Sequence, residues 1–409
     1  MSSPPRYDTF IITAPGLERI TADELDALGI TGGRVIEGGV TLDATRRELY
    51  GANLHLRTAS RVVVRIGSFG AKAFHELARR AGKLPWEAFV SPNLAVSLSV
   101  TCRKSRLYHS DAVAERVASA IASRVPGVSF GADRGEEPVE PERSAPEQLI
   151  LVRLLHDQCT VSVDSSGALL HMRGYRQAVA KAPMRETLAA ATLLASGWTG
   201  AAPLLDPMCG SGTIPVEGAL IARRMAPGMG RRFAFERWPE FDGTLWREVV
   251  AEAESRVLPS AAVPIQGSDR DAGAIEAALA NAARAGVGAD MELVHRALSA
   301  MEPPKEAGWL VSNPPYGVRV GERDRLRNLY AQFGKVVRAR CAGWTVALVS
   351  GDTALERQTG LKLRALLRTS NGGIPVRIVA GKVPDRSSRA VPPAKTIDAG
   401  SDQGLGSSS

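Results

Sequence analysis

The sequence predicts an α/β fold in two parts: an irregular α+β region, then an open, mostly parallel sheet with helices on its faces. The chain has 409 residues, which is more than one hydrophobic core usually supports, so we expect several domains. Up to about residue 165, strand and helix patterns mix without regular alternation, as in α+β folds. From residue 186 onward, short apolar strands alternate with helices, which favours a parallel sheet.

The α+β region is expected to hold short strands and amphipathic helices. Apolar patterning predicts strands over 9–13, 38–42, 62–66, 94–100, 149–155 and 160–163, and helices over 17–28, 49–56, 72–89 and 111–124. Pro85 should interrupt the third helix, and Ser110 or Asp111 should cap the fourth. The stretch 131–146 is rich in Gly, Pro and Glu and should form a surface loop.

The second part shows the expected alternation. Helices are predicted over 186–194, 214–225 and 271–285, and strands over 204–205, 263–267, 291–294, 309–312 and 345–350. The stretch 227–257, which contains Trp238 and Trp246, is an insertion between two of these units. The tail over 383–409 is rich in Ser, Pro, Gly and Asp without apolar periodicity, so we expect it to be disordered.

Composition narrows the function classes. The net charge of +8 suits a polyanionic partner such as nucleic acid, although a basic surface alone explains it equally well. The four cysteines form no C-x-x-C pair, so we expect no metal site and no disulfide framework. No apolar run is long enough for a membrane span, and residues 1–10 lack the pattern of a signal peptide. A cytoplasmic protein without a membrane partner is therefore expected.

The first chemical motif lies where an apolar strand meets a helix, and it reads Asp206-Pro207-Met208-Cys209-Gly210-Ser211-Gly212-Thr213. Gly210 and Gly212 permit positive φ and let a ligand approach the backbone. The helix N-terminus suits an anionic group, and Asp206 adds a negative charge at the strand end. The loop has neither the lysine of a triphosphate loop nor the G-x-G-x-x-G of dinucleotide folds. S-adenosylmethionine, with a carboxylate, an ammonium and a sulfonium, fits this combination of glycines, helix N-terminus and acid. The alternative is a tight turn between strand and helix that binds no ligand.

A second acid, Asp269, follows the next strand, where a carboxylate can accept both ribose hydroxyls of a nucleoside. Its distance along the chain from Asp206 far exceeds the roughly 20 residues of dinucleotide folds, and the insertion over 227–257 accounts for the excess. Asp269 could instead cap the following helix. Asp271 is equally placed for capping, so the two acids may divide these roles between them.

The sharpest motif is Asn313-Pro314-Pro315-Tyr316-Gly317, directly after the strand over 309–312. Two prolines hold the backbone extended, so the Asn313 side-chain oxygen and the Pro314 carbonyl can point at one place. Two such acceptors would bind an exocyclic NH₂ group, while Tyr316 stacks on its base. A sulfonium is already an activated leaving group, so positioning and a preorganised dipole suffice without a strong base. A rigid proline turn without catalytic function is the alternative.

On these residues the chain resembles the THUMP-domain class I methyltransferases, especially the bacterial 23S ribosomal RNA guanine-N2 methyltransferases related to the N-terminal half of RlmL. The resemblance runs from about Phe10 to Val376 and includes four further stretches: Pro15-Gly16-Leu17-Glu18, Leu56-Arg57-Thr58-Ala59-Ser60-Arg61, His171-Met172-Arg173-Gly174-Tyr175-Arg176 and Ala182-Pro183-Met184-Arg185-Glu186-Thr187-Leu188-Ala189. It implies a Rossmann-like class I methyltransferase domain preceded by an α+β ferredoxin-like and THUMP RNA-binding region. The implied divisions are a ferredoxin-like module over 1–60, a THUMP domain over 61–165, a linker over 166–185, the methyltransferase domain over 186–382 and the tail over 383–409.

The resemblance also implies roles for single residues. It places S-adenosylmethionine against Asp206, Pro207, Cys209, Gly210, Ser211, Gly212, Thr213 and Asp269, with Glu186 nearby, and the target base against Asn313, Pro314, Pro315 and Tyr316. Such enzymes commonly carry an acid after the third strand, but here the sequence reads His295-Arg296-Ala297-Leu298. Arg103, Lys104, Arg106, Arg173 and Arg176 are candidate phosphate contacts, with a solvated charged face as the alternative for each.

The leading hypothesis is therefore methylation of a guanine N2 amino group in structured RNA, with 23S ribosomal RNA as the substrate. Transfer RNA is the close rival, because related THUMP enzymes modify either RNA. A DNA adenine or a protein glutamine amide also presents an NH₂ group, but the RNA-type N-terminal region disfavours both. A noncatalytic RNA-binding or ribosome-assembly protein is the alternative from a different class, and the missing acid near Ala297 is its only support.

Overall fold

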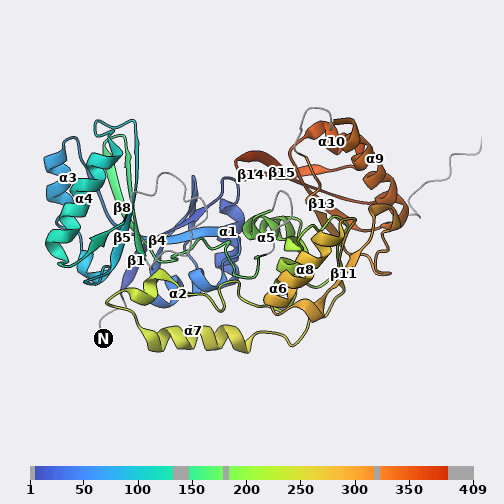
Figure 1. Ribbon diagram of the computed structural model, residues 1–409, viewed down its shortest axis with the longest axis horizontal. Coiled ribbons are helices and arrows are strands. Elements are labelled where there is room, and N and C mark those ends of the chain that lie inside the picture. Colours follow the sequence, from blue (N-terminus) through green and yellow to red (C-terminus); the bar gives the residue numbers. More distant parts are fainter. Residues whose placement is uncertain (1–4, 132–146, 178–183, 317–322, 386–409) are drawn as a thin grey trace, which may run out of the picture.

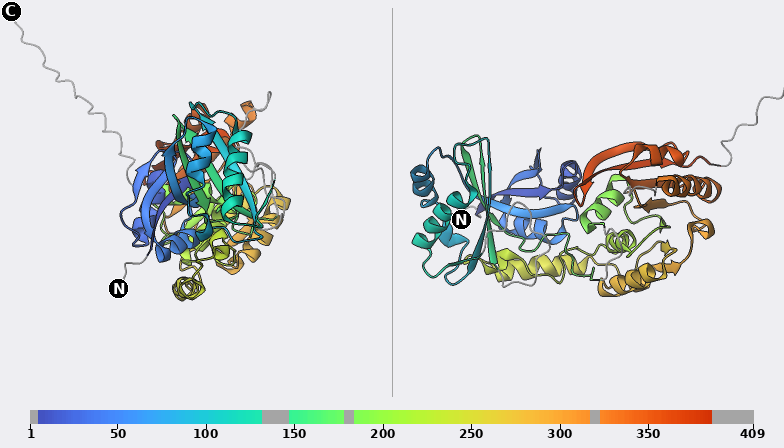
Figure 2. Two further views of the ribbon diagram at one scale, coloured as in Figure 1. Left: turned by 90° about the vertical axis from the view of Figure 1, so that its left-hand side faces the viewer. Right: turned by 45° about the horizontal axis from the view of Figure 1, so that its top comes forward.

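The computed structural model describes residues 5–131, 147–177, 184–316 and 323–385, and the chain forms an elongated molecule (Figure 1). The α+β region occupies one end and the α/β domain the other, and the right-hand view of Figure 2 shows the same arrangement. Nearly all of the predicted surface loop over 131–146 and of the predicted disordered tail lies outside the described residues.

One continuous eight-stranded sheet forms the α+β region. Its order is β2-β3-β1-β4-β8-β7-β5-β6. The strands are β1 (Arg6–Thr13), β2 (Arg34–Ile36), β3 (Gly39–Thr45), β4 (Ala59–Gly70), β5 (Ala95–Arg103), β6 (Ser129–Phe130), β7 (Glu147–Leu155) and β8 (Gln158–Asp164). The long strand β4 pairs with β1 on one side and with β8 on the other. It therefore joins the first three strands to the four that follow.

The helices of this region largely follow the sequence prediction. They are α1 (Glu18–Ala27), α2 (Arg46–His55), α3 (Phe74–Ala81), the short 3-10 turn Trp86–Ala88 and α4 (Ser110–Arg124). The expected break at Pro85 is confirmed, because it separates α3 from that turn. The predicted cap of α4 is wrong: the helix already includes Ser110 and Asp111, and His109 occupies the N-cap without a side-chain hydrogen bond.

The α/β domain contains a seven-stranded sheet in the order β11-β10-β9-β12-β13-β15-β14. Its strands are β9 (Leu204–Asp206), β10 (Ile265–Asp269), β11 (Glu292–His295), β12 (Trp309–Ser312), β13 (Thr345–Ser350), β14 (Arg364–Asn371) and β15 (Ile374–Lys382). The first five strands in this order are parallel, whereas β15 is antiparallel to both of its neighbours. The predicted Rossmann-like, largely parallel architecture is confirmed, and the antiparallel pair β14–β15 is an addition that the sequence prediction missed.

The helices of this domain are α5 (Glu186–Ala195), α6 (Thr213–Ala222), α8 (Ala272–Arg284), α9 (Arg323–Arg340) and α10 (Thr353–Gln358). The chain runs outward from β9 through β10 to β11 and then returns to the other side of β9 as β12. Strand order therefore reverses between β9 and β12. In open α/β sheets, the crevice for ligands lies at the carboxyl ends of the strands at such a reversal.

The insertion after α6 packs against the α+β region, and its helix α7 (Gly243–Ser255) lies along α2 (Figure 1). The Tyr50 ring stacks on Phe235 with centroids 4.3 Å apart, and Trp246 meets both rings edge-on. On the outside, Arg47 of α2 pairs with Glu248 of α7 at 2.6 Å. Buried aromatic clusters contribute strongly to core stability. Since the insertion starts from the α/β domain and packs into the α+β region, it joins the two ends of the molecule.

Candidate active site

The reversal between β9 and β12 brings the two sequence motifs together. Leu205 of β9 lies beside Leu310 of β12 in parallel register, so both strands end at the same edge of the sheet. At that edge the Ser312 hydroxyl donates a hydrogen bond of 2.6 Å to the Asp206 carboxylate. Asp206 opens the glycine loop, and Ser312 directly precedes Asn313. The cofactor-type loop and the Asn-Pro-Pro-Tyr segment are thus neighbours.

Both glycines of the loop adopt the left-handed backbone conformation for which they were singled out. Gly210 has φ +55° and Gly212 has φ +82°. A Cβ on Gly212 would lie 2.9 Å from the Ala278 Cβ, whereas one on Gly210 would meet nothing within 4 Å. Gly212 therefore lets the loop pack on α8, and Gly210 leaves open space above the loop. Gly212 is also the N-cap of α6 and offers no side-chain acceptor to the first-turn amides.

The remaining predicted loop residues form the base of the loop. Pro207, Cys209, Ser211 and Thr213 are all buried. The Cys209 amide donates to the Ser268 carbonyl at 3.0 Å, and the Ser211 carbonyl accepts from the Asn281 side chain at 3.0 Å. Burial raises the pKa of the Cys209 thiol well above its usual value, so the thiol stays neutral. Asn281 was missed from sequence, because it lies among alanines in the middle of α8.

The two acids hold different positions. Asp206 is only 1% exposed, and burial raises its pKa to about 7, against the opposing effect of the Ser312 hydrogen bond. Asp269 accepts hydrogen bonds of 3.0 Å from the amides of Gly210 and Asp271. Asp271 caps α8 by accepting from the amides of Gly273 and Ala274. Of the two acids considered for that role, Asp271 therefore fills it, and Asp269 faces the loop.

The charge of this edge suits a cationic ligand. Asp206 and Asp269 contact hydroxyl and amide groups, and no arginine or lysine within the described residues forms an ion pair with either. Their mutual repulsion raises the pKa of Asp206 further. A buried carboxylate normally has a positive partner. S-adenosylmethionine would bring two positive groups, its ammonium and its sulfonium, so the donor set fits this cofactor.

Asn313 provides a buried acceptor without a partner. Its Oδ1 atom is inaccessible to solvent and receives no hydrogen bond. Pro314 beside it is buried, and Pro315 is exposed. Tyr316 is half-buried, and its hydroxyl accepts a hydrogen bond of 2.8 Å from Asn371 at the end of β14. An unsatisfied buried acceptor is costly in a folded protein, which is why such atoms occur where a ligand supplies the donor.

Glu186 and Arg176 form a buried pair. Arg176 Nε donates to Glu186 Oε1 at 3.0 Å, and the other Glu186 oxygen is buried without a partner. Burial raises the pKa of Glu186 to about 7, although Arg176 opposes the shift. Glu217, one turn into α6 from the glycine loop, also raises the pKa of Glu186. Arg176 also donates to the Met184 carbonyl, so its guanidinium contacts groups of the protein. The sequence predicted a contact with an RNA phosphate for this side chain.

Arg173 is likewise enclosed, and its guanidinium contacts groups of the protein. The residue is 8% exposed, and its guanidinium donates to the Leu170 and Arg57 carbonyls and to the Glu217 carboxylate. Arg57 in turn donates to the Met225 carbonyl at 2.6 Å, beyond the end of α6. This buried network joins the α+β region to the α/β domain, so Arg173 has a structural role.

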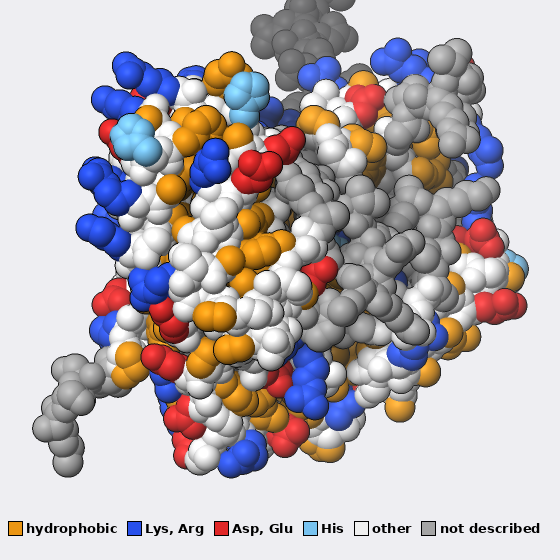
Figure 3. Space-filling view, turned by 60° about the vertical axis from the view of Figure 1, so that its left-hand side comes forward, with side chains coloured by type: hydrophobic (Ala, Val, Ile, Leu, Met, Phe, Trp, Pro, Cys, Tyr) orange, Lys and Arg blue, Asp and Glu red, His pale blue; other side chains and the backbone are white. Residues whose placement is uncertain are grey.

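Arg103, Lys104 and Arg106, the basic loop, behave differently. All three side chains are exposed, Arg103 at the end of β5 and the other two just after it, in the α+β region. Asp157 holds the loop in place by accepting from the Arg106 amide at 2.7 Å. Tyr108, 69% exposed, lies just beyond and was missed from sequence. Figure 3 shows this end of the molecule, where Lys and Arg side chains gather along one margin.

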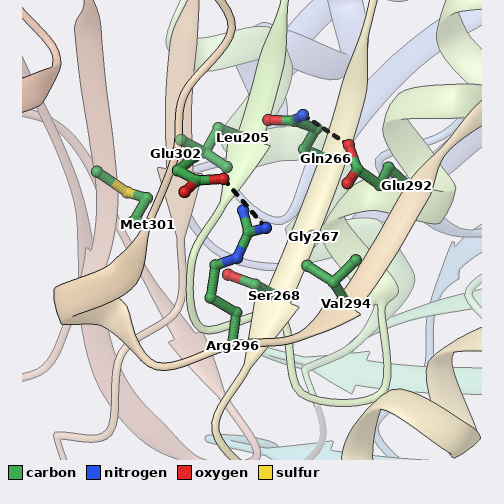
Figure 4. A pocket seen from close by; sticks show the side chains of 9 residues that line it. All are labelled: Leu205, Gln266, Gly267, Ser268, Glu292, Val294, Arg296, Met301 and Glu302. Carbon is green, nitrogen blue, oxygen red and sulfur yellow. Dashed lines mark hydrogen bonds and ion pairs between the residues drawn. The ribbon is translucent and has the colours of Figure 1, made fainter.

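The stretch after β11 that lacks the expected acid contains an arginine. Arg296 follows β11, its amide donates to the Asp269 carbonyl at 2.9 Å, and its side chain pairs with Glu302 at 3.2 Å. This pair closes a small hollow that is also lined by Leu205, Ser268 and other residues of β10 and β11 (Figure 4). None of the predicted cofactor residues lines the hollow, which is therefore separate from the glycine loop.

Within the described ranges, no group of three or more His, Cys, Asp or Glu side chains could hold a metal ion. Among the helices of the same ranges, none is both long and apolar enough to cross a bilayer.

Three family descriptions match successive parts of the chain. Residues 8–63 match the RlmL ferredoxin-like domain, residues 71–164 the THUMP domain, and residues 173–376 the RMKL-like methyltransferase domain. These matches follow the order of the two sheets described above. They also cover the glycine loop and the Asn-Pro-Pro-Tyr segment with a single methyltransferase domain.

Whole proteins are similar over nearly the full length. A Synechocystis sp. protein, slr0064, provisionally named an RNA methyltransferase, is 35% identical over 90% of this chain and 95% of its own length. The ribosomal RNA large subunit methyltransferase K/L of Syntrophotalea carbinolica is 35% identical over 90% of this chain, but this chain spans only 53% of that protein. The solved structure of SMU.472, provisionally described as a methyltransferase and complexed with S-adenosylhomocysteine, is 30% identical with a TM-score of 0.80, covering 92% of this chain and 98% of its own.

The comparisons and the geometry agree on the cofactor, because the closely similar solved structure holds the demethylated product of S-adenosylmethionine and the loop here suits the same ligand. The chain belongs to the RlmL-like family of THUMP-containing class I methyltransferases, whose cofactor is S-adenosylmethionine.

Proposed function

We propose that the protein methylates the exocyclic N2 amino group of a guanine in 23S ribosomal RNA. The observation that carries this proposal is the unpartnered, buried Oδ1 of Asn313, next in sequence to Ser312 and hence close to Asp206. An acceptor in that place needs a donor from the substrate, and an exocyclic amine supplies one. The second donor of the amine would go to the Pro314 carbonyl, with the base stacked on Tyr316.

The cofactor supplies an electrophilic methyl group on a positively charged sulfur. Asp206, Gly210, Gly212 and Asp269 would hold it at the ends of β9 and β10, with Glu186 close to the base of the loop. As the bond from nitrogen to the methyl carbon forms, the bond from that carbon to sulfur breaks and the neutral thioether leaves. The oxygens of Asn313 and Pro314 would stabilise the cationic amine until it gives up one proton to solvent. No side chain has to remove a proton beforehand, because the rigid Asn-Pro-Pro-Tyr segment orients the nitrogen lone pair.

The RNA contacts are proposed for the other end of the molecule. The basic loop supplies three exposed cations, and Tyr108 adds an exposed aromatic ring beside them. Cations contact phosphates, and an exposed ring can stack on an unpaired base. In this division of labour, residues 61–165 grip the RNA, residues 186–382 carry out the transfer, and the target base leaves its stack to reach Asn313. A substrate of this kind places the protein in the cytoplasm.

The proposal is tested by methyl transfer to defined RNAs. Purified protein and S-adenosylmethionine are incubated with 23S ribosomal RNA or with transfer RNA, and the digested nucleosides are identified by mass spectrometry. We expect N2-methylguanosine in the ribosomal RNA. For Asn313→Ala we expect a rate of methyl transfer at least about 100-fold lower than that of the wild type, since one preorganised group commonly contributes that much. The affinity for the cofactor should be unchanged.

The other outcomes separate the alternatives. N2-methylguanosine formed only in transfer RNA would replace the substrate and keep the chemistry. An adenine methylated on its N6 amine would replace the target base and keep the amine chemistry. Methylation of a ring carbon or of a ribose hydroxyl, or wild-type turnover in Asn313→Ala, would refute the role of the amine-binding segment. RNA binding without transfer to either substrate, together with no cofactor binding at millimolar concentration, would favour a noncatalytic RNA-binding protein.

A further inference from the structure

We propose that Asn371 is a positioning residue that fixes the ring of Tyr316 against the target base, an inference that rests on the proposed function. The Asn371 Nδ2 atom donates a hydrogen bond of 2.8 Å to the Tyr316 hydroxyl, although 55 positions separate the two residues. The ring that should stack on the base is thus held at its far end by a residue outside the Asn-Pro-Pro-Tyr motif.

A second contact restrains the same ring. A Cβ on Gly351 would lie 2.7 Å from the Tyr316 Cδ2 atom and 3.3 Å from its Cγ atom. No side chain fits there, so the backbone after β13 packs directly against the ring. Contacts at the hydroxyl and along one ring edge leave Tyr316 little freedom to rotate, whereas a tyrosine held only by its own backbone could turn about χ1 and χ2.

Asn371 is mounted on a rigid element. It ends β14 and pairs with Ile374 across the turn formed by Gly372 and Gly373. Both glycines have positive φ, +55° and +80°, which is the conformation of a tight two-residue hairpin turn. The adjoining strand β15 pairs with β13, which leads to Gly351. The two restraints on Tyr316 therefore come from one continuous part of the sheet.

This arrangement assigns a function to the antiparallel pair β14–β15. The motif at the end of β12 supplies the acceptor and the ring, and the hairpin fixes the angle at which the ring meets the base. A misplaced ring would still permit cofactor binding, but it would present the amine to the methyl group less often. The loss is therefore expected in kcat more than in the affinity for RNA.

A double-mutant cycle with Asn371→Ala and Tyr316→Phe tests the coupling in the full-length protein. Either substitution removes the same hydrogen bond, so each should lower kcat about three- to tenfold, and the double variant should be no slower than the slower single variant. Ser370→Ala, an exposed residue on the same strand, is the matched control and should keep wild-type kcat. Cofactor affinity should be equal in all variants.

Two outcomes would overturn this inference and leave the proposed function intact. Multiplicative losses in the double variant would show that the two side chains act independently. The second readout needs no substrate and uses protein labelled with fluorotyrosine. The ¹⁹F resonance of Tyr316 is identified as the signal that is missing in Tyr316→Phe. Asn371→Ala should shift this resonance, and an unmoved signal would refute the contact. A wild-type enzyme that methylates neither RNA would overturn the proposed function and this role with it, whereas an active enzyme with independent losses would overturn this role alone.

Discussion

Ser312→Ala should weaken cofactor binding in a pH-dependent way. The Ser312 hydroxyl donates to Asp206 at 2.6 Å, and both side chains are buried. Hydrogen bonds to a charged group contribute about 1.5–3 kcal/mol, and one pKa unit corresponds to about 1.36 kcal/mol. Loss of the hydroxyl should therefore raise the pKa of Asp206 by roughly one to two units above its value of about 7.

The sign of the effect follows from which form binds the cofactor. The carboxylate attracts the cationic cofactor, and it is lost as the pH falls through about 7 in the wild type. In Ser312→Ala it is already lost in large part at pH 8. Because the raised pKa means that ionisation of Asp206 costs folding free energy, the ligand-free protein should show the opposite trend and lose stability as the pH rises towards 7.

Isothermal titration with S-adenosylmethionine at pH 6 and pH 8 measures this. The apparent dissociation constant scales inversely with the ionised fraction of Asp206, because the carboxylate is the form that binds. At pH 8 that fraction falls from about nine tenths to between about one half and one tenth, so the dissociation constant of Ser312→Ala should be about two- to tenfold above that of the wild type. At pH 6 both fractions are small and differ by the full change in pKa, so the dissociation constants should differ by about 10- to 100-fold. Ser268→Ala is the matched control, because its buried hydroxyl on the neighbouring strand has no hydrogen-bond partner. Equal losses at both pH values, or no loss, would refute the reasoning.

Three further predictions concern the loop, the domain junction and the RNA contacts. Gly212→Ala should destabilise the protein by about 2–4 kcal/mol in urea denaturation, through its positive φ and its clash with α8, whereas Gly210→Ala should cost only about 1–2 kcal/mol. Arg173→Met leaves the Glu217 carboxylate buried without its cation and should lower the free energy of unfolding by about 3–5 kcal/mol. The added change Glu217→Gln should restore part of that loss, and a double variant less stable than Arg173→Met would contradict this. Replacing the three cations of the basic loop with alanine should make the slope of log association constant for RNA against log salt concentration less steep by about two to three. Cofactor affinity should not change, and an unchanged slope would show that the basic loop does not contact the RNA.

Much of the fold could be predicted from local patterns. The helix α4 was expected over 111–124 and spans Ser110–Arg124, because its apolar spacing is regular over about four turns. The glycine loop and the Asn-Pro-Pro-Tyr segment were placed at strand ends because each follows a short apolar strand directly. Their proximity then follows from parallel strands that share one edge.

The parts that sequence did not show depend on distant contacts. Arg173 and Arg176 looked like phosphate contacts because a basic residue in a linker gives no sign of a buried partner. Their partners, Glu217 and Glu186, become visible only when α5 and α6 pack together. The aromatic residues of the insertion likewise gave no indication that they complete the core of the α+β region.

That packing also changes how the two ends should be tested. Removal of residues 1–165 would be the simplest way to separate RNA binding from cofactor binding. The structure shows that such a truncation would expose Phe235, which stacks on Tyr50, and Trp246, which meets the Tyr50 ring edge-on. Point variants of the basic loop in the full-length chain are therefore the sounder test of RNA binding.

The central claim is that the Asn313 oxygen binds the amine that receives the methyl group. A crystal structure with S-adenosylhomocysteine and the methyl-accepting RNA tests it directly. We expect the Asn313 Oδ1 atom at about 2.9 Å from the guanine N2 atom, a hydrogen-bond distance, with that nitrogen facing the cofactor sulfur. A base bound elsewhere, or an Asn313 oxygen paired with another group of the protein while the base is in place, would contradict the account.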